Sequence, residues 1–300
     1  MEWYRDVNRL FTGMIFFYYF LIKRRILMKK LLIILSFLLL VSCGSKQETK
    51  MNKLEQIKDK GEIVVSVSPD YAPMEFIDKD NNVVGSDIEL SKYIAEKLGV
   101  ELKLETMDFS AALTAVDFDK ADIGVSGFGW TKDREENYDL SITYNVEQGS
   151  ESTCNAILIR EEDKDTLKTL DDFAGKKVAA QANSIQEEIA SKQTKATIEK
   201  VSTIDQGILE LTSKKVDGLT LSCVVAEGYA KSVDGLYISE APLETDTTKI
   251  GNVVVIKKGD TELLDEINAI ISEVNEKKLY EKWYDEAIGK AKEAGIDLGE

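Results

Sequence analysis

The sequence of 300 residues is long enough for one large domain or two medium domains, and its formal net charge is −16. Residues 1–42 carry seven Lys or Arg and two Asp or Glu, so the remainder holds 31 basic and 52 acidic side chains, a net charge of −21. Such a surface repels nucleic acid and anionic lipid. The sequence also contains no His, the commonest general base and zinc ligand. Nucleic-acid binding, His-based zinc sites and most hydrolytic mechanisms are therefore disfavoured.

The N-terminal region has the pattern of an export signal. Basic residues after Met28 precede an apolar run, residues 31–41, which is too short to span a bilayer and has the length of a signal-peptide core. Small residues then lead to Cys43, which matches the bacterial lipobox, where the Cys is lipidated and the signal is cleaved. We expect a lipoprotein signal peptide at residues 28–42 and a polar tether at 43–53.

This pattern predicts a protein exported to the cell envelope and anchored to the membrane, on its periplasmic or extracellular face, through a lipid on Cys43. Residues 1–27 have no role in this scheme, and we interpret them as a wrongly assigned extension upstream of the true start at Met28. An amphipathic anchor is the alternative.

The globular pattern begins near residue 62. A strand at residues 63–67 leads into a loop, 68–73, which two prolines stiffen and which presents Tyr71. Residues 75–77 and 83–84 have the pattern of a hairpin. Asp78, Asp80, Asn82 and Glu89 occupy EF-hand positions, but Val83 stands where that motif needs Gly and no helix precedes the loop. A polar turn is therefore expected, and no metal site.

Helices and strands alternate in the next segment. Ser86 and Glu89 have the spacing of a capping box, at the start of a helix that Gly99 ends. A strand at residues 102–104, a short helix at 110–116 and a strand at 123–125 follow. This alternation predicts a mostly parallel sheet covered by helices.

The strongest candidate site lies in residues 123–141. After the strand comes a corner of small residues with two aromatic residues interleaved: Ser126, Gly127, Phe128, Gly129 and Trp130. A helix then begins at Thr131, with Arg134 behind its first turn. Small residues let backbone N–H groups approach a ligand, and a guanidinium offers two parallel donors to a carboxylate. The pattern indicates a site for a small anion; the alternative is a tight turn with Arg134 paired to Glu135 or Asp139 on a solvated face.

From about Leu54 to about Trp283 the sequence resembles the bacterial family 3 extracellular solute-binding proteins, the polar amino-acid receptors of ABC importers. Their pattern at the site is a strand, a small-residue corner, Thr, an acidic residue and Arg, then an aromatic residue or Leu followed by Ser. The resemblance implies an α/β, two-lobed clamshell of the type II periplasmic-binding-protein kind, each lobe a mostly parallel sheet flanked by helices. It also implies that Arg134 grips the α-carboxylate of the ligand and that Tyr71 packs against it.

A second corner, residues 181–187, follows a strand at 178–180. The family has Gly where Asn183 stands, and Asn tolerates the left-handed turn. Ser184 and the start of the following helix, including Gln186, offer a second anion contact that would face Arg134 from the other lobe. Taken alone, Ser184 is an ordinary N-cap.

Two crossings between lobes are expected, the first in the polar segment 145–153. Further strands are predicted at residues 156–159, 218–221 and 249–256, and helices at 205–215, 261–276 and 280–292. The first lobe would comprise residues 54–150 plus 250–300, and the second lobe residues 151–249.

The sequence departs from the family pattern at the ammonium end of the ligand. Many members carry an Asp there, at the end of a second-lobe strand, where this chain has Ser222. Another family Asp aligns with Ser68. A hydroxyl does not neutralise an ammonium, so either Asp70 or Glu75 supplies the charge or the ligand is not a simple zwitterion.

Cys154 and Cys223 are the remaining cysteines. In an exported protein they could form one disulfide, but the sequence does not show whether they meet. Two isolated thiols do not make a metal site.

We expect a monomeric solute-binding lipoprotein without cofactor or catalysis, which closes over a small carboxylate-bearing ligand, most simply an amino acid, and delivers it to the permease of an ABC importer. The main alternative is an enzyme, because some proteins with this fold are dehydratases of prephenate-like acids. That work would fall to Glu75, Glu147 or Asp70. A sensory ectodomain is a third hypothesis, disfavoured because no apolar span follows the last predicted helix.

Overall fold

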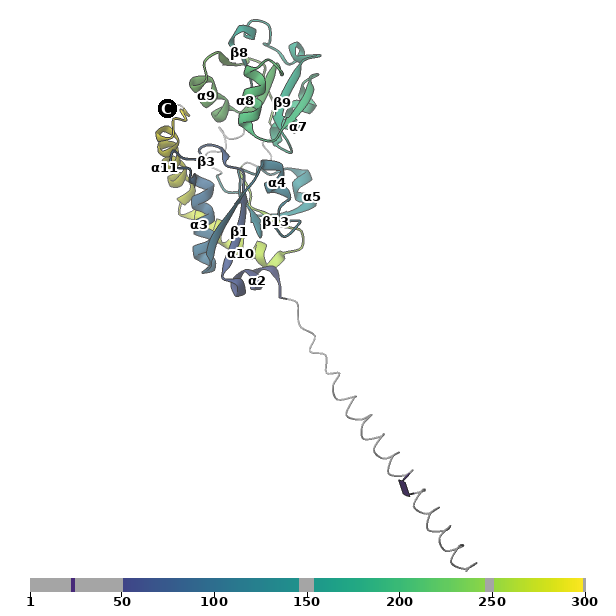
Figure 1. Cartoon of the computed structure of the whole chain (residues 1–300), viewed down its shortest axis with the longest axis vertical. Coiled ribbons are helices and arrows are strands. Elements are labelled where there is room, and N and C mark those ends of the chain that lie inside the picture. The colour runs from purple at the N-terminus through teal and green to yellow at the C-terminus, as the bar shows by residue number, and fades with distance from the viewer. Residues whose placement is uncertain (1–22, 25–50, 146–153, 246–250, 299–300) are drawn as a thin grey trace, which may run out of the picture. The chain divides into compact units, whose positions relative to one another are not determined.

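The computed structural model describes residues 23–24, 51–145, 154–245 and 251–298 (Figure 1). The chain divides into two units, residues 1–50 and 51–300, and the fold below is that of the second. The predicted signal peptide, Cys43 and Glu147 lie outside the described residues. No helix in the described part of the chain is both long and apolar enough to cross a membrane.

One five-stranded sheet has the order β5–β1–β6–β13–β7. Its strands are β1 (Glu62–Val67), β5 (Glu101–Thr106), β6 (Ile123–Gly124), β7 (Tyr138–Leu140) and β13 (Val255–Lys257). Strand β1 pairs in parallel with β5 and β6, whereas β13 runs antiparallel to β6 and β7. Four of the five strands thus run in one direction. We call this sheet and its helices the first lobe.

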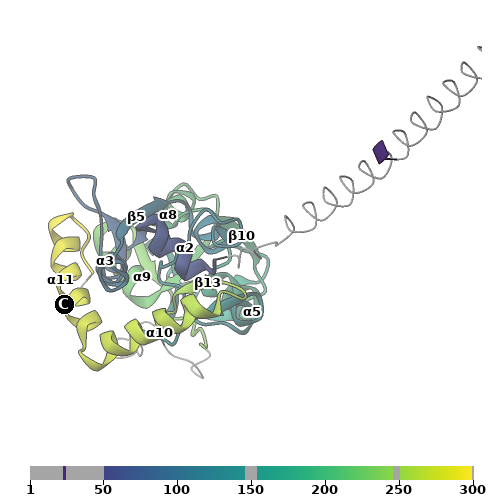
Figure 2. The same cartoon turned by 90° about the horizontal axis from the view of Figure 1, so that it is seen from below.

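The helices of the first lobe cover both faces of its sheet. They are α2 (Lys53–Lys60), α3 (Ser86–Leu98), α4 (Phe109–Thr114), α5 (Lys132–Asn137), α10 (Thr261–Glu276) and α11 (Leu279–Glu293). Successive side chains of a strand point to opposite faces, so Ile63 and Val65 join the core under α3 and α10 while Val64 joins the core under α4. Figure 2 shows α10 and α11 following one another along the edge of this lobe. Burial on both faces explains why β1 is almost continuously apolar.

A second five-stranded sheet has the order β10–β9–β11–β8–β12. Its strands are β8 (Asn155–Arg160), β9 (Lys177–Gln181), β10 (Thr197–Val201), β11 (Gly218–Ser222) and β12 (Leu236–Ile238). Its helices are α7 (Ile185–Gln193), α8 (Ile204–Thr212) and α9 (Cys223–Ser232), with 3-10 turns η1 (Glu161–Asp163) and η2 (Leu170–Phe173). Only β8 runs against the other strands. This second lobe therefore repeats the mostly parallel arrangement of the first, as expected.

A small antiparallel sheet extends from the first lobe and consists of β2 (Asp70–Tyr71), β3 (Glu75–Ile77) and β4 (Val83–Val84). The predicted hairpin is confirmed. Its turn is held by Asp78 Oδ1, which accepts from the amides of Asp80 and Asn82. Glu89 points elsewhere, to Lys92 and Lys290, and no group of three or more acidic, His or Cys side chains in the described residues could hold a metal ion.

Two local predictions are wrong. The helix α3 has Gly85 as its N-cap and no side-chain cap, because the Ser86 hydroxyl donates to Tyr280 instead of capping the helix with Glu89. Of the strand predicted at residues 249–256, only residues 255–256 belong to a strand in the described part of the chain, namely β13. The Val254 amide donates to the Ser141 hydroxyl, which interrupts the backbone ladder before Val255.

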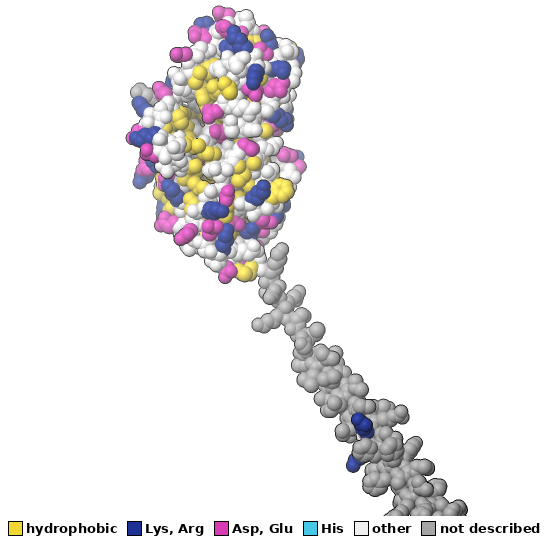
Figure 3. Space-filling view, in the orientation of Figure 1, with side chains coloured by type: hydrophobic (Ala, Val, Ile, Leu, Met, Phe, Trp, Pro, Cys, Tyr) yellow, Lys and Arg dark blue, Asp and Glu magenta, His cyan; other side chains and the backbone are white. Residues whose placement is uncertain are grey.

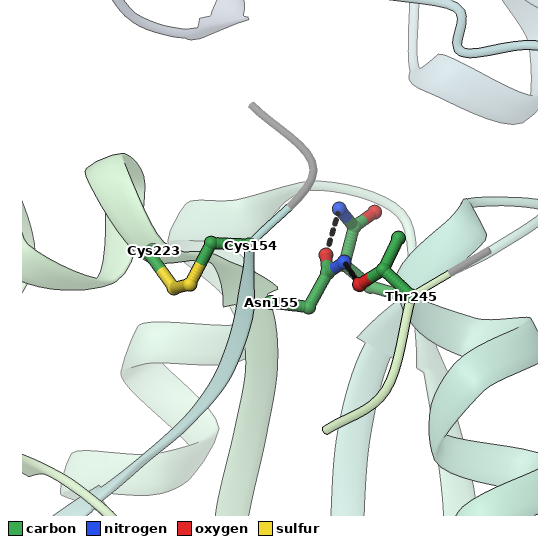
Figure 4. Close-up of a disulfide and its surroundings, with 5 residues drawn as sticks. Cys154, Asn155, Cys223 and Thr245 are labelled. Carbon is green, nitrogen blue, oxygen red and sulfur yellow. Dashed lines mark hydrogen bonds between the residues drawn. A yellow bond between two sulfur atoms is a disulfide. The ribbon is translucent and has the colours of Figure 1, made fainter. Parts of the chain in front are cut away.

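Cys154 and Cys223 form a disulfide with a Cα–Cα distance of 5.3 Å (Figure 4). It joins the residue before β8 to the first residue of α9, and the Cys223 amide also donates to the Cys154 carbonyl. The question that the sequence left open is thus resolved.

The C-terminal tail, residues 294–298, links α11 of the first lobe to α9 of the second. Ile296 and Leu298 pack near Phe76. Gly228 in α9 faces this tail so closely that a Cβ there would lie 3.1 Å from the Asp297 carbonyl oxygen.

On the face seen in Figure 3, acidic and basic side chains are interspersed instead of gathering into one charged field.

Candidate ligand-binding site

A cavity of about 420 Å³ lies between loops of the two lobes. The loops follow the carboxyl ends of β1, β6 and β9, where open α/β sheets bind ligands. Seven residues singled out in the sequence line this cavity: Tyr71, Gly127, Gly129, Trp130, Arg134, Ser184 and Gln186. The sequence pattern therefore located the cavity. The other six candidate residues do not line it: Asp70, Glu75, Ser126, Phe128, Asn183 and Ser222.

Arg134 is the central charged group of the cavity. Thr131 caps α5 by accepting from the Arg134 amide, and the Arg134 side chain is only 4% exposed. The guanidinium donates to the carbonyls of Gly129 and Asn183, the latter at 2.8 Å. It also lies over the rings of Phe109 and Phe128.

No carboxylate in the described part of the chain lies within ion-pair distance, 4.0 Å, of Arg134. Burial lowers its pKa to about 10, which still leaves the guanidinium charged at neutral pH. A buried cation is costly unless an anion neutralises it. The alternative of a solvated surface arginine is excluded by this burial, and the cavity beside Arg134 is suited to a carboxylate.

The second-lobe corner faces Arg134 through its backbone. Asn183 has a φ of +63°, the left-handed turn expected for it. Its carbonyl accepts from Arg134 and its side-chain Nδ2 donates to Ser110 Oγ at 2.6 Å, and these two contacts cross between the lobes. Ser184 caps α7 by accepting from the Glu187 amide at 3.0 Å, and it lines the cavity. The positive end of α7 is thus presented to the same space as Arg134.

Asp70 joins the lobes and does not line the cavity. Its Oδ2 accepts from Gln181 Nε2 at 2.8 Å and from the Ile204 amide at 3.0 Å, both in the second lobe. Its Oδ1 accepts from Ser68. Burial raises the pKa of Asp70, while the bonds from Ile204 and Ser68 act in the opposite direction.

Tyr71 packs against the cores of both lobes. Its hydroxyl is hydrogen-bonded with Ser222, and burial raises its pKa. Ser222 is 2% exposed and lies behind Tyr71, outside the cavity lining. The position where many family members carry the ammonium-binding Asp is therefore occupied here by a hydroxyl pair that closes the wall.

Glu75 and Asp87 form a buried carboxyl pair beneath the Gly127 corner. Ser126 donates to Glu75 Oε1 at 2.9 Å, while Asp87 accepts from the Gly127 amide at 2.7 Å, from Tyr144 at 2.9 Å and from Tyr280. Burial raises the pKa of both carboxyl groups, and the nearby charge of Asp87 raises the pKa of Glu75 further. Ser126 and the Gly127 amide are thus committed to this pair and do not contact a ligand directly.

Phe128 is not a wall of the cavity. Its side chain is fully buried in the core of the first lobe, with its ring centroid 4.9 Å from that of Phe109. Its carbonyl accepts from the Val253 amide, shortly before β13, and its ring lies beneath the Arg134 guanidinium. Only Trp130 of the two interleaved aromatic residues lines the cavity.

Asn155 and Thr245 are among the lining residues that were not recognised in the sequence. Asn155 accepts from Gln186 and donates to Thr245, each at 2.9 Å (Figure 4). Asn155 directly follows the disulfide residue Cys154. This spatial neighbourhood is formed by segments about ninety residues apart, so no local motif could have indicated it.

Two α/β lobes enclose a cavity at the carboxyl ends of their strands, and the cavity is lined by a buried cation that has no carboxylate partner in the described residues. These features define a two-lobed solute-binding protein. Residues 63–289 match the model of the bacterial extracellular solute-binding proteins, family 3. The chain belongs to this family, and the resemblance inferred from the sequence is confirmed.

Several proteins are similar to this chain. The arginine-binding extracellular protein ArtP of Bacillus subtilis (strain 168) is 31% identical over 82% of this chain and 92% of its own length. The structure of an amino acid ABC transporter substrate-binding protein, AbpA from Streptococcus pneumoniae, bound to L-arginine, has 33% identity and a TM-score of 0.71, covering 79% of this chain and 98% of that one. An ancestral amino acid-binding protein, a precursor of cyclohexadienyl dehydratase, has 27% identity and a TM-score of 0.66, covering 79% and 99%.

Proposed function

We propose that this protein binds an amino acid with a cationic side chain, arginine first among them, and delivers it to the permease of an ABC importer. The observation that carries the proposal is Arg134, a buried guanidinium without a carboxylate partner in the described residues that lines a cavity between two lobes. Arginine-binding relatives support the choice of ligand.

In this proposal the ligand carboxylate pairs with Arg134, which has no carboxylate partner among the described residues. Charge-assisted hydrogen bonds from the guanidinium, together with the positive end of α7 at Ser184, would provide most of the affinity. Contacts such as Arg134 to Asn183 cross between the lobes, so they form only when the lobes are close. Ligand binding and lobe closure are therefore coupled.

We further propose that the protein acts as a monomer and is tethered by a lipid on Cys43 at the periplasmic or extracellular face of the membrane. The lipobox after residues 31–41 supports the anchor. The charge of residues 43–300 supports a soluble domain held near, but not adsorbed to, an anionic membrane surface.

A second candidate is an enzyme acting on a small carboxylic acid. One observation favours it: Glu75 is a buried carboxyl group with a raised pKa close to the cavity, as a general acid requires. Binding without turnover remains the proposal, because Glu75 accepts from Ser126 and does not line the cavity. Incubating the protein with prephenate and arogenate and finding product would favour the enzyme.

The decisive experiment starts with native mass spectrometry of protein purified without denaturation, which weighs any retained ligand. Isothermal titration calorimetry then compares L-arginine, L-lysine, L-glutamine and L-cystine. Tight one-to-one binding of arginine, with weaker binding of glutamine, would support the proposal. Binding of no amino acid at all would contradict it.

A further inference from the structure

The Glu75 and Asp87 carboxyl groups lack a counter-ion. Both side chains are 0% exposed. In the described part of the chain neither has a Lys or Arg within ion-pair distance, and Glu75 Oε2 meets no N–H or hydroxyl donor. Two carboxylates buried side by side without a cation repel each other, so one of them takes up a proton. The pair therefore holds a single negative charge.

That charge is distributed unevenly. Asp87 accepts from the Gly127 amide and from two tyrosine hydroxyls, which are donors that favour a carboxylate. Glu75 accepts only from Ser126 in the described residues, and Asp70 is a further acidic group acting on it. The proton consequently resides on Glu75.

The titratable groups facing the pair come from three segments. Asp70 and Tyr71 belong to the hairpin sheet, Tyr144 to the loop after β7, and Tyr280 and Tyr284 to α11. Burial raises the pKa of Tyr71, Tyr144 and Tyr280 above the ordinary tyrosine value. These hydroxyls stay neutral at physiological pH, so Glu75, Asp87 and Asp70 are the groups of this cluster that titrate.

Glu75 lies directly beneath the cavity wall. A Cβ at Gly127 would be 3.5 Å from Glu75 Oε1 and 3.0 Å from the Tyr71 ring. Gly127, Tyr71 and Met74, the residue before Glu75, all line the cavity. Gly127 has a φ of +55°, and its missing side chain leaves only backbone between the carboxyl group and a ligand.

We propose that the pair shares one proton in the ligand-free protein and that a cationic group of the ligand displaces it. The Glu75 O–H bond breaks, the proton goes to solvent, and the resulting carboxylate pairs with the guanidinium or ammonium of the ligand. The exchange conserves charge in the buried cluster, since one proton leaves as one cation enters. This inference rests on the proposed function, and it defines the ligand class as cationic.

The test is the number of protons released on binding. Calorimetric titrations of the wild-type protein in phosphate and in Tris at equal pH, from pH 5 to 8, give that number from the difference in apparent enthalpy. Three probes separate the sources of the cation: L-arginine, L-citrulline with a neutral side chain, and argininic acid without the α-ammonium. Release of up to one proton with arginine and argininic acid, but not citrulline, assigns the cation to the side chain. Release with arginine and citrulline, but not argininic acid, assigns it to the α-ammonium.

The pH dependence of the ligand affinity is a second measurement, and it uses the wild-type protein. Where the pair is protonated, affinity for the displacing ligand should rise about tenfold per pH unit. Glu75→Gln should abolish both proton release and this pH dependence, and should weaken the displacing ligand at least tenfold. Glu89→Gln, which changes a half-buried glutamate of α3 that pairs with Lys92, should leave both unchanged.

Tight binding of arginine with no proton released at any pH from 5 to 8 would overturn the inference and leave the proposed function intact. Proton release that persists in Glu75→Gln would overturn it as well. Failure of all three probes to bind would instead count against the proposed function, so the two failures are distinguishable.

Discussion

Asp70 of the hairpin sheet accepts a hydrogen bond from the amide of Ile204, the first residue of α8, at 3.0 Å. A first-lobe carboxylate thus satisfies a free N–H at the N-terminus of a second-lobe helix, where the helix dipole favours negative charge. Gln181 donates to the same oxygen. Asp70 therefore acts as a latch between the lobes, which explains why it does not line the cavity as a substitute for the missing ammonium-binding Asp.

We predict that Asp70→Asn weakens ligand binding about tenfold, because a hydrogen bond to a charged group contributes about 1.5 to 3 kcal/mol and this one exists only when the lobes are close. Calorimetry with L-arginine measures the change. Asp205→Asn is the matched control, since the bond that Asp205 accepts from Tyr229 stays within the second lobe. Equal effects of the two variants would mean that Asp70 is not a latch.

Arg134→Lys should lower the affinity for L-arginine by about 1 to 3 kcal/mol, because an ammonium cannot offer two parallel donors to a carboxylate. Agmatine, which lacks the carboxylate, should lose much less affinity, and the difference isolates the carboxylate contact. Ligand-free stability should also fall, since the guanidinium bonds to Gly129 and Asn183.

The control for this variant is Arg160→Lys. Arg160 is a partly buried arginine that also bonds to backbone carbonyls, those of Leu211 and Val216, but it pairs with acidic side chains and lies outside the cavity. It should reduce stability and leave arginine affinity unchanged. Should agmatine and arginine lose equal affinity in Arg134→Lys, the residue does not bind the carboxylate.

Replacing the disulfide, in Cys154→Ala with Cys223→Ala, should lower the free energy of unfolding by about 2 to 5 kcal/mol. The bridge closes a loop with a sequence separation of 69, so its loss gives the unfolded chain more freedom. Urea denaturation with and without reductant measures the effect. A wild-type transition that reductant does not move would show that the bridge is absent or makes no contribution in solution.

The ligand-free protein should become less stable as the pH rises. Burial raises the pKa of Glu75 above its ordinary value of 4.5, so the folded state binds this proton more tightly than the unfolded state. The stabilisation is complete below pH 4.5 and is lost as the pH rises through the folded-state pKa, at up to about 1.4 kcal/mol per pH unit. Urea denaturation from pH 5 to 8 should show this slope in the wild type and a flatter one in Glu75→Gln. Asp70 shifts in the same direction, so only the difference between the two proteins is diagnostic.

Cys43→Ser should release the protein from the membrane fraction, because the lipid would have no thiol to modify. Met28→Ala should abolish expression from the native gene if Met28 is the start. Cell fractionation and the intact mass of the product provide the measurements. A Cys43→Ser protein that stays in the membrane fraction and retains residues 1–27 would contradict both expectations.

Elements with strong local patterns were predictable from the sequence. The helix expected at residues 261–276 has the bounds of α10, because its apolar period and flanking residues agree with its tertiary contacts. The capping box at Ser86 was wrong although the local pattern fits, since a hydroxyl far along the chain, that of Tyr280, competes for the same side chain. Edge strand β10, with the polar sequence TIEKV, has no apolar signal and was not expected.

The site residues also fall into two groups, those that local sequence predicts and those that only the folded chain brings together. Arg134 was predictable because its geometry depends on neighbours within a few residues, Thr131 and Gly129. Asp87 was missed because an acidic residue in the first turn of a helix is common and needs no other explanation. Its partners Tyr144 and Tyr280 lie 57 and 193 residues away, so only the folded chain reveals the cluster.

The contact between Gly228 and the C-terminal tail makes the end of this chain a natural place for a sensor. The tail follows α11 of the first lobe and touches α9 of the second, and neither Gly228 nor residues 294–298 line the cavity. A fluorophore attached at Leu298 and a quencher on the exposed side of α9 would change their separation whenever the lobes move. Their signal would follow closure in real time without altering any residue that meets the ligand.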